Sequence, residues 1–75
     1  MEWQSVIITE TKWHKFSKEL RKEVLDVMPK SQIIGRYADE VINAIKMYNK
    51  YELAEKMEKE LRFVILHEAN TGENH

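Results

Sequence analysis

Cysteine is absent from this sequence of 75 residues, which contains only two glycines and one proline. Without cysteine, the chain forms neither disulfide bonds nor thiolate metal sites. Pro29, Gly35 and Gly72 are its only strong helix breakers, so they divide it into few, long elements. No apolar run approaches the roughly 20 residues of a membrane-spanning helix, and no secretory leader is recognisable. We therefore expect a cytoplasmic protein without membrane contact.

The sequence also lacks an excess of charge of either sign, because it has twelve Lys and Arg and thirteen Asp and Glu, for a net charge of −1. No overall field attracts nucleic acid or an anionic membrane, so such binding requires a local patch. The 43% hydrophobic and 33% charged residues are typical of a folded globular chain. Residues 1–75 are enough for one domain, with a core so small that good helix packing or self-association must stabilise it.

The sequence predicts a mainly α fold: a small three-helix domain with a short N-terminal extended or β segment. The β-branched cluster within residues 2–9 favours an extended arm or strand. The first helix is expected over residues 11–28, capped by Thr9 or Thr11 and ended by Pro29. Its core-facing stripe spans about 120° and consists of Trp13, Phe16, Leu20, Val24, Val27 and Met28.

A second helix is expected over residues 31–49, with Ser31 as its cap. Gly35 is unfavourable in its first turns, so the helix begins near Arg36 or the glycine permits close packing. A broad apolar face makes this helix the central one: Ile33, Ile34, Tyr37, Ala38, Val41, Ile42, Ala44, Ile45 and Tyr48. Because the apolar phase changes near Asn49-Lys50, the chain should turn there and continue antiparallel.

The third helix is expected over residues 51–70, followed by a flexible tail at 71–75. Three acid-before-base pairs at i,i+4, from Glu52–Lys56 to Glu58–Arg62, favour it. Its run at residues 61–66 is apolar enough to suggest an alternative, a strand at 61–67 paired with residues 3–9.

Phe63 and Leu66 fall outside the core face of this third helix. Either the N-terminal arm folds across them and completes the core, or they form an interface, together with Trp3. For so small a domain, a homodimer is the first interface to expect.

Site chemistry is sparse. Ser5, Ser17 and Ser31 lack the tight glycine-containing turn of a nucleophile, and each fits a structural role. His14, His67 and His75 are too few and too dispersed for a metal site, although Glu10 and His14 share an i,i+4 spacing. No glycine-rich phosphate loop is present. We therefore expect no enzyme, and no catalytic, cofactor-binding or metal-binding residues.

Lys15, Lys18, Arg21 and Lys22 form a basic stripe on the first helix, suited to a phosphate backbone. Glu19, Glu23 and Asp26 flank the stripe and can pair with it, which favours an ordinary solvated face. An extended arm followed by two helices resembles the element order of ribbon-helix-helix DNA-binding dimers. However, the arm lacks arginine and lysine for reading bases, and Pro29-Lys30-Ser31 replaces the usual glycine-containing turn. We do not assign the chain to that family.

These observations favour a small non-enzymatic regulatory or inhibitory module that binds another protein through a helical surface, as a homodimer. Such small free-standing chains are common among bacterial and phage regulators. The alternative is a small DNA-binding regulator or antitoxin that uses the basic face of the first helix.

Overall fold

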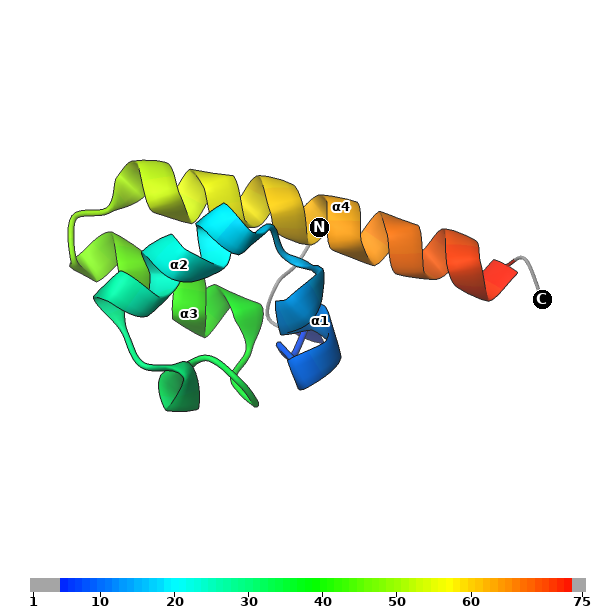
Figure 1. The fold of residues 1–75 in the computed structure, drawn as a ribbon, viewed down its shortest axis with the longest axis horizontal. Helices are drawn as coiled ribbons and strands as arrows, with labels where there is room; N and C mark the ends of the chain where they lie inside the picture. Colours follow the sequence, from blue (N-terminus) through cyan, green and yellow to red (C-terminus); the bar gives the residue numbers. More distant parts are fainter. Residues whose placement is uncertain (1–4, 74–75) are drawn as a thin grey trace.

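A computed structural model describes the backbone of residues 5–73 and the side chains of residues 5–67. Its elements are α1 (Glu10–Lys15), α2 (Lys18–Val27), a 3-10 turn η2 (Lys30–Gln32), α3 (Ala38–Met47) and α4 (Tyr51–Glu73). The long helix α4 lies along one side of the molecule, and its last turns extend beyond the other helices (Figure 1). The predicted mainly α fold is confirmed, with four α-helices rather than three within the described residues.

The predicted helix over residues 11–28 is instead two helices, because the backbone becomes extended at Phe16 (ψ 154°) and Ser17 (ψ 152°). Thr9 caps α1 as predicted, with its hydroxyl oxygen accepting a hydrogen bond from the Lys12 N–H (3.1 Å). Ser17 caps α2 by accepting from the Leu20 N–H (3.2 Å). Trp13 and Phe16 are both buried in the core, as predicted, and their rings meet edge to face at 6.1 Å.

The predicted helix over residues 31–49 begins at Ala38, close to the alternative start near Arg36, and Ser31 lies in η2 without capping α3. Gly35 takes a left-handed conformation (φ 83°), which a helix cannot contain. The extended segment around Ile8 pairs with this loop: Gly35 N–H donates to the Ile8 carbonyl (2.8 Å) and Ile8 N–H to that of Arg36 (2.9 Å). The N-terminal segment thus pairs with the residues that precede α3; its first four residues lie outside the described part.

The turn between α3 and α4 lies where the change of apolar phase predicts it. Asn49 has a positive φ (62°), its N–H donates to the Lys46 carbonyl (2.9 Å), and the Lys50 N–H donates to that of Ile45 (3.3 Å). These two bonds form a Schellman motif, which ends α3 and reverses the chain.

α4 begins at Tyr51 as predicted, and its backbone stays helical to Glu73, beyond the predicted start of the tail at residue 71. The alternative strand at residues 61–67 is wrong, since all seven are helical. The helix is favoured because Leu61 and Val64 share one buried face at a spacing of three residues.

The core lies between α2, α3 and the inner face of α4, with Trp13 and Phe16 closing one end. Its fully buried large side chains are Ile8, Leu20, Val24, Ile33, Val41, Ile45, Met57 and Leu61. No polar side chain is buried among the described residues. Tyr37 and Tyr48, which the helical wheel places with the core, are exposed because α3 spans only Ala38–Met47.

Candidate protein-interaction surface

Phe63 and Leu66 lie on the outer side of α4, with 72% and 59% of their surface exposed. Leu61 and Val64, in the same apolar run, are buried at 0% and 3%. The Phe63 ring stacks on His67, with centroids 6.1 Å apart and planes inclined by 6°. The prediction that Phe63 and Leu66 leave the core face is confirmed.

The N-terminal arm does not cover these two residues in its described part. Its residues Val6 and Ile8 pair instead with the backbone of residues 35–38, next to the start of α3. Trp3, the third residue predicted for this interface, lies outside the described residues. Within the described residues, Phe63 and Leu66 are therefore exposed side chains that the arm does not contact.

Glu60 fixes α4 to the break between α1 and α2, less than one turn before Phe63. Its Oε1 accepts a hydrogen bond from the Ser17 N–H and its Oε2 accepts one from the Ser17 hydroxyl, both at 2.7 Å. In a capping box, a glutamate three residues after the cap accepts from the cap N–H. Leu20 occupies that position here, and Glu60 supplies the carboxylate from another helix. Phe63 thus projects from a part of α4 that is hydrogen-bonded to the start of α2.

Sequence reasoning assigned Ser17 to a helix surface and missed this anchor. Serine is a common helix cap, so Ser17 itself was a weak signal for a helix start. Nothing nearby in the sequence indicates its partner Glu60, which is 43 residues away. Beside the anchor, a shallow groove of about 410 Å³ runs between α1 and α4. It is lined by Lys15, Ser17, Lys59, Glu60, Phe63 and Val64. Phe63 therefore forms one wall of a surface depression.

A second exposed apolar group, which sequence reasoning also missed, surrounds the turn between α3 and α4. It consists of Met47, Tyr48 and Tyr51, and Met47 is 84% exposed. Tyr48 and Tyr51 lie after the end of α3 at Met47, so they do not continue its buried stripe. Apolar side chains are therefore exposed near both ends of the described part of α4.

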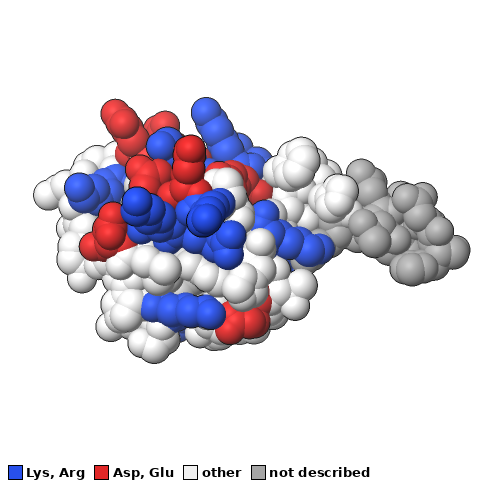
Figure 2. All heavy atoms as spheres, viewed as in Figure 1, with Lys and Arg blue, Asp and Glu red and all other residues white. Residues whose placement is uncertain are grey.

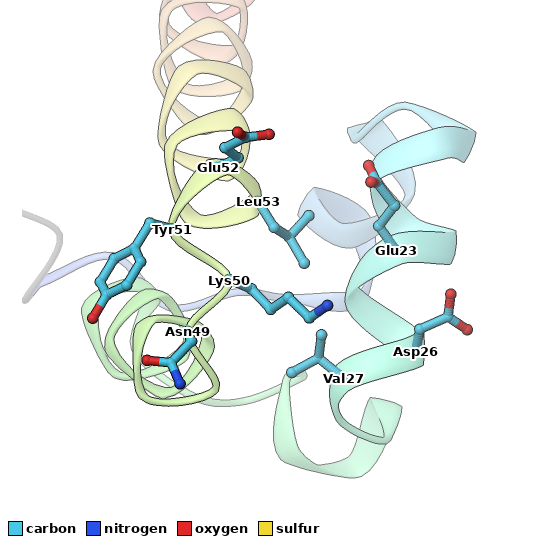
Figure 3. A pocket seen from close by; sticks show the side chains of 8 residues that line it. All are labelled: Glu23, Asp26, Val27, Asn49, Lys50, Tyr51, Glu52 and Leu53. Carbon is cyan, nitrogen blue, oxygen red and sulfur yellow. The ribbon is translucent and has the colours of Figure 1, made fainter.

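A hollow of about 590 Å³ lies between α2 and the start of α4 (Figure 3). Lys50 extends from the turn toward α2, and Tyr51 points to the opposite side. The carboxylates of Glu23, Asp26 and Glu52 stand around the rim. Within the described residues, no three His, Cys, Asp or Glu are placed to hold a metal ion. This hollow therefore brings together side chains of both charges.

The predicted basic stripe is divided by the helix break, which leaves Lys15 on α1 and places Lys18, Arg21 and Lys22 on α2. Arg21 is half-buried, and its Nη1 lies 3.2 Å from His14 Nδ1. Glu23, expected to pair within the stripe, instead accepts from Lys56 of α4 (3.3 Å). Blue and red side chains alternate over this face in Figure 2. The stripe belongs to a surface of mixed charge.

No family model, curated protein or solved structure matches the chain. No helix within residues 5–73 is long and apolar enough to cross a bilayer.

Proposed function

We propose that this protein is a non-enzymatic regulatory or inhibitory module that binds another protein through the outer face of α4, around Phe63 and Leu66. The observation that carries the proposal is the exposure of an aromatic and an aliphatic side chain, 72% and 59%, three residues apart on one helix. Such a pair matches the anchors with which helices insert into apolar grooves of other proteins.

The surroundings of Phe63 support this proposal. Anchors contribute most to affinity when the helix that carries them is already ordered, because less conformational freedom is lost on binding. The two hydrogen bonds between Glu60 and Ser17 provide that order. The exposed Lys59 and Arg62 border the anchors, as polar residues border the apolar centre of many interfaces.

Affinity capture from the native cells tests the proposal. Wild-type protein should retain a protein partner whether or not the lysate is treated with nuclease. Phe63→Asp and Leu66→Asp each place a charge within the contact and should reduce the captured partner at least about tenfold. Leu25→Asp is the matched control, because Leu25 is also exposed (46%) but lies on α2. Unchanged capture by both α4 variants contradicts the proposal.

The same experiment detects the alternative, a DNA-binding regulator. In that case the captured material is nuclease-sensitive and its retention falls steeply with salt. Reversing the charges of Lys15, Lys18, Arg21 and Lys22 then abolishes capture, while Phe63→Asp leaves it unchanged.

A further inference from the structure

The groove beside Phe63 combines an apolar lining with a charged rim. Phe63 and Val64 line it with apolar atoms, and Lys15, Lys59 and Glu60 supply its charged groups. The lysine side chains add aliphatic stems below their ammonium groups. Because the groove is shallow, it suits side chains of another protein better than a small molecule, which needs a more enclosing cavity.

The two lysines of the rim outweigh its single carboxylate. Lys15 lies on α1 and Lys59 on α4, and both are exposed. The Glu60 carboxylate accepts hydrogen bonds from the N–H and the hydroxyl of Ser17, the cap of α2, both at 2.7 Å. The start of a helix carries roughly half a positive charge, which offsets part of the negative charge of Glu60. The groove is therefore positive, although the chain as a whole has a net charge of −1.

Lys59 is the cation of this rim that can best accept a new partner. Among the side chains of residues 5–67, that of Lys59 has no salt bridge, whereas the neighbouring Lys56 is paired with Glu23 (3.3 Å). Its ammonium group can bind an incoming carboxylate without first breaking an internal ion pair. It lies one turn of α4 before Phe63, so a single short segment can reach both residues.

We propose that the groove receives an acidic segment of the partner protein, which places an apolar side chain against Phe63 and a carboxylate on Lys59. This inference rests on the proposed function and specifies the chemistry of the partner. Aspartate and glutamate are complementary to the positive rim, whereas a basic segment would meet like charges there. The apolar side chain covers Phe63 and also excludes water from the adjacent ion pair, which strengthens it.

Selection from a phage-displayed library of random linear peptides tests this chemistry without knowledge of the partner. Peptides retained by the wild-type protein should be enriched in Asp and Glu close to an aromatic or aliphatic residue. Lys59→Glu reverses the charge of the rim, because two carboxylates then face one ammonium group. This variant should lose the acidic preference and bind a peptide selected on the wild type about tenfold more weakly, measured by fluorescence polarisation.

Lys50→Glu is the matched control. It changes the net charge of the chain by the same amount, and Lys50 is also exposed but lies at the turn before α4, outside this groove. It should keep both the acidic preference and the affinity. Because both lysines are exposed, neither variant should alter the helical circular dichroism spectrum, which verifies that a loss of binding is not a loss of fold. Equal weakening by the two variants would mean that net charge alone attracts the peptides, and would overturn the inference.

Three further results overturn it: no peptide selected above background, selected peptides without an excess of acidic residues, or an acidic preference that Lys59→Glu leaves unchanged. Displacement of a selected peptide by an equal amount of polyglutamate or single-stranded DNA also overturns it, because the groove then recognises charge without the apolar contact. None of these results overturns the proposed function, which fails only if Phe63→Asp and Leu66→Asp leave partner capture unchanged.

Discussion

Two pairs of apolar residues alternate within six positions of α4 and differ in their burial. Leu61 and Val64 are buried, whereas Phe63 and Leu66 are exposed. Their hydrophobicity is similar, and the helical periodicity alone directs one pair inward and the other outward. The described part of the chain thus buries only half of the apolar side chains of these two pairs, which is the reason for proposing a binding role for the exposed pair.

The buried pair should dominate stability. Leu61→Ala removes a fully buried side chain and leaves a cavity between α4 and its neighbours, so we expect a loss of about 2–5 kcal/mol in the free energy of unfolding. Urea unfolding followed by circular dichroism measures this loss. Val64→Ala, which removes less volume, should cost less. A loss below about 1 kcal/mol for Leu61→Ala would show that α4 is not packed as described.

The anchor between the two pairs should have an intermediate effect. Ser17→Ala removes the hydroxyl that caps α2 and donates a hydrogen bond to Glu60. Glu60→Gln removes the negative charge of the group that accepts the two hydrogen bonds from Ser17. We expect each to cost about 1 kcal/mol, the usual scale for a helix cap. In a double-mutant cycle the two losses should not add, because both variants disrupt the same contact. Additive losses would indicate that Ser17 and Glu60 act independently.

The exposed pair should contribute least. Phe63→Ala and Leu66→Ala remove side chains that contact few neighbours, so each should change the free energy of unfolding by less than about 0.5 kcal/mol. This comparison requires protein dilute enough to be monomeric, since association stabilises the fold by mass action. A loss above about 1 kcal/mol under those conditions would mean that another part of the chain covers these residues.

Local signals in the sequence were sufficient to predict parts of this fold. The turn near Asn49 was predictable, because both the change of apolar phase and a residue that tolerates positive φ lie in the same short segment. The outward position of Phe63 and Leu66 was predictable for the same reason: periodicity is a local property.

Contacts between distant segments account for the errors. The break at Ser17 depends on Glu60, and the late start of α3 depends on the pairing of Ile8 with Gly35 and Arg36. Gly35 was recognisable as unfavourable in a helix, but its hydrogen-bond partner was not. The exposure of Tyr48 was missed because the end of α3 was predicted two residues too late.

Site-specific photo-crosslinking in the native cells tests the central claim most directly. A benzophenone side chain at position 63 should yield covalent protein adducts. The same side chain at position 25, where Leu25 is 46% exposed on α2, should yield few. Absence of adducts at position 63, or equal amounts at both positions, would contradict a protein-binding role for the outer face of α4.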